Sequence, residues 1–131
     1  MQAPKPAPVL WLTGLSGSGK TTLARALEQA LREINLHAFV LDGDQIRCGL
    51  SADLGFSAAD RSENIRRIGE AAKLLSQAGV IAIVAAISPL ATDRANARRT
   101  IGNENFIEIY CNAPLEVCVK KILTHLSQKR L

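Results

Sequence analysis

An eight-residue segment near the N-terminus constrains the fold more than any other part of this sequence. It reads Gly14-Leu15-Ser16-Gly17-Ser18-Gly19-Lys20-Thr21 and so meets the pattern GxxxxGK[ST]. Glycines let the backbone curl until successive N–H groups point at phosphate oxygens, and a helix that starts at the lysine adds the positive end of its dipole. The lysine of such a loop reaches the β- and γ-phosphates of ATP, and the hydroxyl after it is a ligand for Mg²⁺. The segment therefore predicts a site for ATP and Mg²⁺.

The flanking residues supply the strand and the helix between which such a loop must lie. Val9–Thr13 is a short apolar run that ends at Gly14, which predicts a buried parallel strand. Leucine and isoleucine then recur at helical spacing, which predicts a helix over residues 20–34. Because strand, loop and helix agree, we prefer a functional loop to a chance match, and Lys20 is also expected to act in catalysis. The residues expected to bind the nucleotide are Gly14, Leu15, Ser16, Gly17, Ser18, Gly19, Lys20, Thr21 and Thr22.

Strands and helices are predicted to alternate along the rest of the chain. Residues 80–87 are apolar on both faces of the expected strand, which indicates a central position in a sheet. The alternation favours an α/β fold, a P-loop NTPase-type three-layer sandwich whose parallel sheet is covered by helices on both faces. The remaining predicted elements are strands at residues 37–41 and 106–110, a loop at 48–56, and helices from Ser57 or Asp60 to Gly79, over 92–101 and after Pro114.

Composition narrows the class of protein and its partners. The 131 residues suffice for one domain, which we expect over residues 9–131, after a disordered Pro/Ala-rich tail at 1–8. The longest apolar run is far shorter than the about twenty residues that a membrane-spanning helix needs, and the tail lacks the apolar stretch of a secretory signal. A net charge of +4 without basic clusters favours a small polyanionic substrate over nucleic acid.

The cysteines bear on the compartment. The chain has three of them, Cys48, Cys111 and Cys118, and they form no CxxC pair. Their odd number argues against a disulfide framework. We therefore expect buried or half-buried free thiols in the reducing cytoplasm, with no membrane partner.

The tripeptide Asp42-Gly43-Asp44 follows the second predicted strand. Open α/β sheets bind ligands at the carboxyl ends of their strands, so both carboxylates are expected to face the phosphates. One of them can hold the hydration shell of Mg²⁺, while the other can take a proton from an acceptor hydroxyl. A plain turn is an equally good interpretation, because Asp-Gly is a common turn dipeptide.

Arginines and one aromatic residue come after this tripeptide. Arg47 and Arg61 supply cations for an anionic acceptor. Arg66 and Arg67, on a predicted surface helix, are expected to be solvated instead. Phe56 lies in a polar loop, where an aromatic side chain either plugs the core or stacks on a base, and spacing alone leaves both interpretations open.

Taken together, five blocks of sequence resemble one enzyme family. In chain order they are GLSGSGKTT, LDGDQIRCGL, DLGFSAADRSENIRRIGEAAKLL, ISP and FIEIYCNAPLEVC, and they extend from about Val9 to Cys118. The series is similar to the adenylylsulfate kinases, the enzymes of sulfate activation. The resemblance implies phosphoryl transfer from ATP to the 3′-hydroxyl of adenosine 5′-phosphosulfate, which gives 3′-phosphoadenosine 5′-phosphosulfate and ADP. It also implies a homodimer and a possible association with ATP sulfurylase.

The resemblance further implies roles for individual residues. Asp42 would hold Mg²⁺ through water, and Asp44 would contact the acceptor and act as the base. The serine of the ISP block is described in the family as a phosphoserine site, which Ser88 matches; an N-cap of the following helix is an equally good interpretation of Ser88. The residues expected at the acceptor are Asp44, Arg47, Phe56 on the adenine, Arg61 and Asn64 on the phosphosulfate end, and Ile87 and Ser88 in the pocket wall.

The sequence departs from the family pattern in three places. Gln45 and Leu90 replace an asparagine and a tyrosine that the family usually carries. After Cys118 the family continues with a basic lid, whereas residues 122–131 already look like its terminal helix. We therefore expect a lid-sized segment to be missing between Lys121 and Ile122. Two rivals stay open: another small-metabolite kinase of this loop class, and a non-catalytic nucleotide-binding module without a lid.

Overall fold

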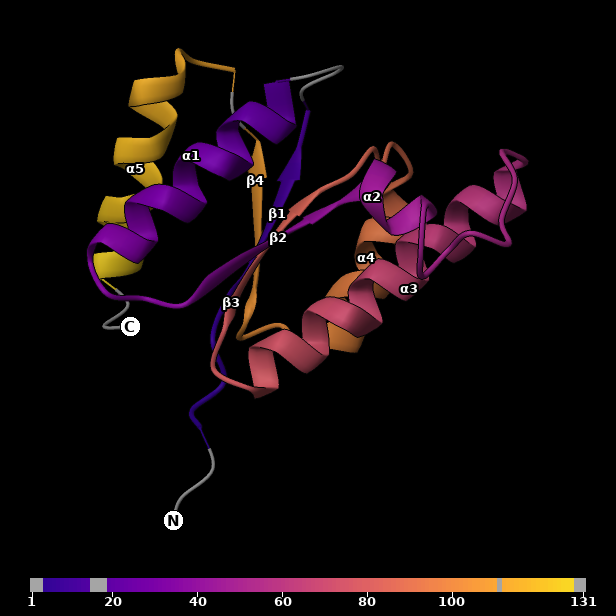
Figure 1. Ribbon diagram of the computed structural model, residues 1–131, viewed down its shortest axis with the longest axis horizontal. Coiled ribbons are helices and arrows are strands. Elements are labelled where there is room, and N and C mark those ends of the chain that lie inside the picture. The colour runs from indigo at the N-terminus through magenta and orange to yellow at the C-terminus, as the bar shows by residue number, and fades with distance from the viewer. Residues whose placement is uncertain (1–3, 15–18, 111, 129–131) are drawn as a thin grey trace.

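A parallel sheet with helices on both faces forms the computed structural model, which describes residues 4–14, 19–110 and 112–128 (Figure 1). Its strands are β1 (Val9–Thr13), β2 (Ala38–Asp42), β3 (Ile81–Ala85) and β4 (Phe106–Tyr110). Its helices are α1 (Gly19–Glu33), α2 (Gly43–Arg47), α3 (Ala58–Gln77), α4 (Ala91–Ile101) and α5 (Leu115–Gln128). The predicted α/β architecture is confirmed, and the predicted bounds of β1 and β4 match the structure.

The strands pair in the order β2-β3-β1-β4, all parallel. The two inner strands are buried along their whole length, which confirms that the run at residues 80–87 is central. Because all four strands point the same way, their carboxyl ends lie at one edge of the sheet. That edge collects Thr13, Asp42 and Tyr110, each the last residue of its strand.

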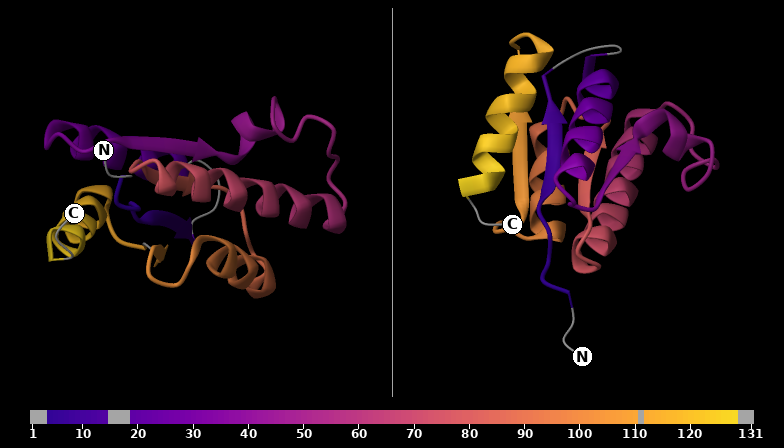
Figure 2. Two further views of the ribbon diagram at one scale, coloured as in Figure 1. Left: turned by 90° about the horizontal axis from the view of Figure 1, so that it is seen from below. Right: turned by 60° about the vertical axis from the view of Figure 1, so that its left-hand side comes forward.

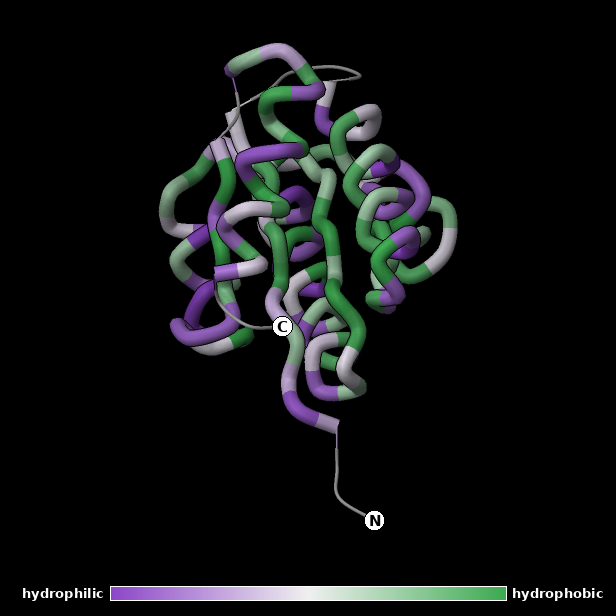
Figure 3. The backbone as a smooth tube through the Cα atoms, turned by 90° about the vertical axis from the view of Figure 1, so that its left-hand side faces the viewer, coloured by the Kyte–Doolittle hydropathy of each residue, from purple (hydrophilic) through white to green (hydrophobic). Residues whose placement is uncertain are grey.

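The helices cover the two faces in pairs. In Figure 1, α1 and α5 lie to the left of the sheet, and α3 and α4 lie to its right; the turned views of Figure 2 show the same pairs from below and from the side. Each face of the sheet forms a hydrophobic core with its pair of helices, and alternate residues of β1 point into the two cores. Leu10 packs with α1 and α5, whereas Trp11 packs with α3 and α4. In Figure 3 the strands are mostly green, while the helices change between green and purple along their turns.

The ends of α3 follow the local signals in the sequence. Ser57 is the N-cap, and its side chain accepts a hydrogen bond from the N–H of Asp60. The helix ends at Gln77, two residues before Gly79, whose φ of +82° favours glycine. Of the two caps considered, Ser57 is therefore the one used.

The first residues before β1 are part of the fold. Ala7 is buried, its N–H donates to the carbonyl of Ser76 at 2.9 Å, and its own carbonyl accepts from Ser76 Oγ at 2.5 Å. Ala7 therefore belongs to the folded domain and not to the tail expected over residues 1–8. The small side chain fits beside the end of α3, a contact that a Pro/Ala-rich composition does not reveal.

The last helix is continuous where the missing segment was expected. Lys121 and Ile122 are consecutive residues inside α5, and the buried positions Cys118, Ile122 and Leu126 repeat every four residues against the core. The apolar stripes before and after the expected junction therefore form one face.

The prediction of free thiols is wrong for Cys118, which is disulfide-bonded. Cys48 is a free thiol, but it is exposed and not buried, and Cys111 lies outside the described residues. An odd number of cysteines excludes complete pairing, but it does not exclude a single bond. In the ranges that the structure describes, no helix is both long and apolar enough to cross a membrane.

Candidate active site

The side chain of Lys20 is buried at the start of α1, where the phosphate loop ends. Only 7% of the residue is exposed, and this burial lowers the pKa of its ammonium group. Among the described residues no ion pair involves Lys20. A buried cation without a partner is costly, so this position favours an anion such as a phosphate. Leu15, Ser16, Gly17 and Ser18, which complete the predicted loop, lie outside the described residues.

Asp42 connects the start of α1 to the start of α2. Its Oδ2 accepts a hydrogen bond from Thr21 Oγ1 at 3.0 Å, and its Oδ1 accepts from the N–H groups of Asp44 at 2.9 Å and Gln45 at 3.3 Å. Asp42 is thus the N-cap of α2, a short helix that the sequence interpretation did not predict. Thr22 is exposed on the same first turn of α1.

The oxygens of Thr21 and Asp42 suit Mg²⁺. Mg²⁺ prefers oxygen ligands and is usually held by one or two protein side chains together with waters and substrate phosphates. Because the Thr21 hydroxyl donates its hydrogen to Asp42, the lone pairs of Oγ1 remain available. In the described ranges no group of three or more His, Cys, Asp or Glu residues forms an all-protein metal cage, so the phosphates would have to supply further ligands.

A cavity of about 400 Å³ lies beside Lys20 at the carboxyl edge of the sheet. It brings together Gly14, Lys20, Ile87 and Ser88, four residues that the sequence placed at the site. Its lining residues are Thr13, Gly14, Lys20, Ile87, Ser88, Pro89, Arg94, Glu108 and Tyr110. Another cavity of about 250 Å³, lined by residues such as Lys5, His37 and Glu104, lies at the amino ends of the strands and contains none of the predicted site residues.

Ser88 is held inside this edge of the protein. It is 6% exposed, and its hydroxyl accepts a hydrogen bond from Trp11 Nε1 at 3.0 Å. The N-cap of α4 is Leu90, which makes no side-chain cap bond, so the N-cap interpretation of Ser88 is wrong. Ile87, by contrast, is 72% exposed.

Tyr110 is a wall of the cavity that sequence reasoning missed. Its ring lies against Gly14, where an added Cβ would be 1.9 Å from the ring carbons Cδ2 and Cε2. Gly14 also has a φ of +89°, which L side chains rarely adopt. The sequence could have predicted this position, because Tyr110 is the last residue of the fourth predicted strand and so lies at the same edge of the sheet as the phosphate loop.

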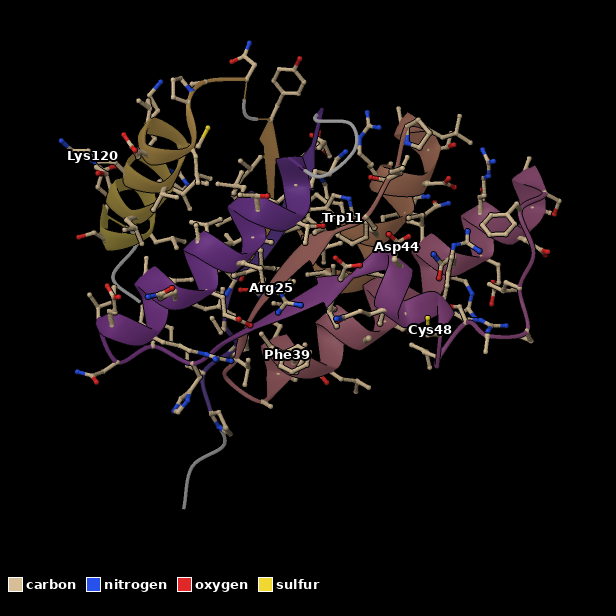
Figure 4. The ribbon with its side chains drawn as sticks, turned by 45° about the horizontal axis from the view of Figure 1, so that its top comes forward. Trp11, Arg25, Phe39, Asp44, Cys48 and Lys120 are labelled. Atoms are coloured by element: carbon tan, nitrogen blue, oxygen red, sulfur yellow. The ribbon has the colours of Figure 1, made fainter. Side chains whose placement is uncertain are left out.

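Arg47 and Phe56 lie together at the end of α2. The guanidinium carbon of Arg47 is 4.7 Å from the centroid of the Phe56 ring, and Arg47 NH1 donates to the carbonyl of Gly55 at 2.9 Å. Phe56 is 72% exposed, so it does not plug the core, and the guanidinium of Arg47 covers one face of its ring. Figure 4 shows Asp44 on the same short helix, with Cys48 at the end of it.

The other predicted acceptor residues lie on α2 and on the first turns of α3. Asp44 and Arg61 are exposed, and in the described part of the chain neither takes part in an ion pair. Asn64 is only 4% exposed, and its Oδ1 has no hydrogen-bond partner there. An unpaired buried amide oxygen costs about 1–3 kcal/mol, which a donor from a ligand would remove.

Arg67 is not solvated as expected. Its guanidinium forms a fork with Asp53 at 2.6 and 3.0 Å, donates from Nε to Glu63 at 2.9 Å, and reaches the carbonyl of Leu50 at 3.1 Å. Hydrogen bonds from Arg66 and Arg67 lower the pKa of Glu63 to about 2. Asp53 and Leu50 belong to a loop 14 and 17 residues away, so the helical pattern alone could not reveal these two partners, whereas Glu63 lies four residues away on the same helix. Arg67 fastens the loop that carries Phe56 to α3.

Known proteins match both the sequence and this geometry. The adenylyl-sulfate kinase of Acaryochloris marina is 55% identical over 121 residues, which are 92% of this chain and 59% of that protein. The chain therefore spans less than two thirds of the length of that curated relative.

Solved structures of APS kinases also resemble this chain. The Mycobacterium tuberculosis APS kinase CysC, as a cysteine-to-alanine mutant, superposes with a TM-score of 0.88 at 39% identity, covering 95% of this chain and 99% of that one. Its complex with AMPPNP and APS gives a TM-score of 0.78 at 46% identity, covering 96% of this chain and 74% of that one. The hexameric APS kinase of Thiobacillus denitrificans superposes with a TM-score of 0.82 at 35% identity, covering 95% of this chain and 30% of that one.

The sequence pattern of one family covers nearly all of the described fold. The pattern described as adenylylsulphate kinase matches residues 6–130, from the segment before β1 to beyond the end of α5. The matched range includes the phosphate loop, the Asp42 cap, the Arg47–Phe56 pair and the Ser88 segment. The chain therefore belongs to the adenylylsulphate kinase family.

Proposed function

We propose that this chain transfers the γ-phosphoryl group of ATP to the 3′-hydroxyl of adenosine 5′-phosphosulfate. The observation that carries the proposal is the shared cavity at the carboxyl edge, in which buried Lys20 lies beside the Ile87–Ser88 segment. Lys20 suits the triphosphate, and the Ile87–Ser88 segment belongs to the expected acceptor pocket. Family membership and the solved relative with AMPPNP and APS support the same pair of ligands.

On the nucleotide side, Lys20 would contact the β- and γ-phosphates from its buried position. Thr21 would offer its hydroxyl oxygen to Mg²⁺, with Asp42 behind it as the partner of that hydroxyl and, through water, of the metal ion. When bound, Mg²⁺ neutralises charge that develops on the transferring phosphoryl group. The protein therefore positions the phosphates and needs to form no covalent bond with them.

On the acceptor side, the exposed ring of Phe56 would stack on the adenine. Arg61 and the side-chain NH2 group of Asn64 would meet the phosphosulfate end, because an anion accepts hydrogen bonds and offers no donor to the unpaired Oδ1 of Asn64. Asp44, on the first turn of α2, would take the proton of the 3′-hydroxyl. Ser88 would complete the pocket wall. We do not propose that Ser88 is phosphorylated, because its hydroxyl is buried and already accepts a hydrogen bond from Trp11.

A coupled assay tests the proposal. ATP and adenosine 5′-phosphosulfate should give ADP and the 3′-phosphorylated product in equal amounts, and a panel of other hydroxyl acceptors should give no comparable rate. Turnover with another acceptor and none with the sulfated nucleotide would favour a different small-metabolite kinase. ATP binding by calorimetry without any product would favour a nucleotide-binding module that lacks a lid.

The proposal also covers the assembly of the chain and its compartment. We expect a homodimer in the cytoplasm, with a possible association with ATP sulfurylase, and the hexameric relative supports assembly of some kind. Light scattering on the purified chain gives the mass of the assembly. A monomer at all concentrations would contradict the expected dimer.

A further inference from the structure

Two separate parts of Ser88 are each held by a residue from a different element. Trp11 on β1 donates from Nε1 to the hydroxyl oxygen at 3.0 Å. Arg94 on α4 donates from NH1 to the main-chain carbonyl at 2.6 Å. Since both the side chain and the backbone of Ser88 are engaged, the Ile87–Pro89 segment has little freedom to shift.

Arg94 is itself oriented by the neighbouring strand. Its Nε lies 3.6 Å from Glu108 Oε1 on β4, and both side chains are partly exposed, at 24% and 35%. A partly exposed ion pair contributes little to stability, but it can fix the plane of a guanidinium group. The residue before it on α4, Asp93, faces α3 instead, where it accepts a hydrogen bond from Ser62 at 3.1 Å.

We propose that Arg94 is a positioning residue of the acceptor site. Together with Trp11 and Glu108 it forms what we call the Ser88 clamp. The inference rests on the proposed function, because it assigns the clamp to the acceptor half of that site. Ile87 is 72% exposed next to buried Ser88, and both line the cavity with Lys20. The clamp thus decides how Ile87 and Pro89 face a bound acceptor.

The geometry predicts a selective effect. Arg94 and Glu108 line the same cavity as Lys20, but among the described residues the clamp bonds to Ser88 and within itself, and none of its bonds reaches Lys20 or the Thr21–Asp42 contact. Loosening the Ser88 segment should therefore disturb the acceptor and leave ATP affinity unchanged. Small misplacements of a reactant in an active site have large effects on rate, so the clamp need not touch the acceptor to matter.

The sequence provides its own spectroscopic reporter. Trp11 is the single tryptophan of the chain, it is fully buried, and its indole N–H is the group bonded to Ser88. It is labelled in Figure 4. Its fluorescence therefore reports directly on the clamp, without any added label and without turnover.

The experiment compares Arg94→Ala and Arg94→Lys with Arg99→Ala. Arg99 is a matched control because it lies on the same helix, is exposed, and bonds only to Asn96 among the described residues. We expect Arg94→Ala to raise the KM for adenosine 5′-phosphosulfate about tenfold, as for the loss of one charge-assisted hydrogen bond. The KM for ATP should stay within about twofold, and Trp11 emission should move to longer wavelength as water gains access. Arg94→Lys should recover part of both changes, and Arg99→Ala should change neither.

Other outcomes overturn the inference. An equal rise in both KM values would make Arg94 a general structural residue, and unchanged emission together with an unchanged acceptor KM would show that no clamp exists. If Arg94→Ala fails to fold, Glu108→Ala carries the same expectations. Absence of any product with the wild-type chain would contradict the proposed function instead. In that case Trp11 emission alone still decides whether Arg94 holds the Ser88 segment.

Discussion

Arg47 contacts two neighbours, the face of Phe56 and the carbonyl of Gly55. The first contact fixes the ring, and the second fixes the loop just before it. An arginine that arranges its neighbours in this way affects acceptor binding even where its own charge is not used. At the scale of single residues, the site is therefore built from side chains that each hold another in place.

Replacing Arg47 with alanine should affect acceptor binding and ATP binding differently. Removing a hydrogen bond from a charged group should weaken acceptor affinity by about 1.5–3 kcal/mol, while ATP affinity changes little. Titration calorimetry with each ligand measures both. Arg66→Ala is the control, because Arg66 is exposed and bonds only to Glu63 among the described residues. Equal losses for both ligands would show that Arg47 acts elsewhere.

Replacing Gly14 with alanine should lower stability for two separable reasons. The backbone there has a φ of +89°, and the new Cβ would overlap the ring of Tyr110. Denaturant unfolding should show a loss of more than about 1 kcal/mol. In Gly14→Ala combined with Tyr110→Ala, only the backbone strain should remain. Gly49→Ala is the matched control, since a Cβ at Gly49 meets nothing within 4 Å. A loss at Gly49 as large as that at Gly14 would refute the explanation.

At the scale of elements, regular periodicity was enough to place the strands and the long helices. Val9–Thr13 and the run from Phe106 to Tyr110 are apolar segments bounded by turn residues, so their ends are visible in the sequence. Helix α2 was missed because Asp-Gly is typical of turns, and the cap that Asp42 provides depends on where its side chain points. The bonds from Arg67 to Asp53 and from Arg94 to Glu108 could not be predicted, because each joins two elements distant in sequence.

The fastening of the Phe56 loop by Arg67 should depend on pH. Hydrogen bonds from arginine lower the pKa of Glu63 to about 2 and also lower that of Asp53. A carboxylate with a lowered pKa in the folded state stabilises that state above its unfolded pKa of about 4, and this contribution disappears as pH falls through the folded value. The difference in unfolding free energy between wild type and Arg67→Gln should therefore shrink between about pH 4 and pH 2.

Denaturant titrations at several pH values measure that difference, with Arg66→Gln beside it as a control for lost charge. Arg66 shares Glu63 but does not bond to the loop, so its substitution should leave the loop attached. A difference for Arg67→Gln that stays constant from pH 5 to pH 2 would contradict the assignment.

At the scale of the whole molecule, the open sheet has two edges, and the edge at β2 is protected. The outward N–H of Val40 donates to Glu28 Oε2 at 3.1 Å, and Arg32 NH2 donates to the outward carbonyl of Ala38 at 3.2 Å. Both side chains come from α1, and they pair with each other at 3.5 Å. Unpaired groups on an edge strand invite another strand to join, so α1 has a second role besides carrying Lys20.

Removing this protection should cause self-association without loss of the fold. In Glu28→Ala combined with Arg32→Ala, the backbone of β2 loses both partners next to Phe39, which is 51% exposed. Light scattering should then show particles that grow with protein concentration, while the circular dichroism of dilute samples stays unchanged. Arg25→Ala is the control, because Arg25 pairs with Glu28 at 3.6 Å but does not bond to the strand. If the double variant and the control scatter alike, the side chains of α1 do not guard the edge, and the exposed Phe39 is tolerated for another reason.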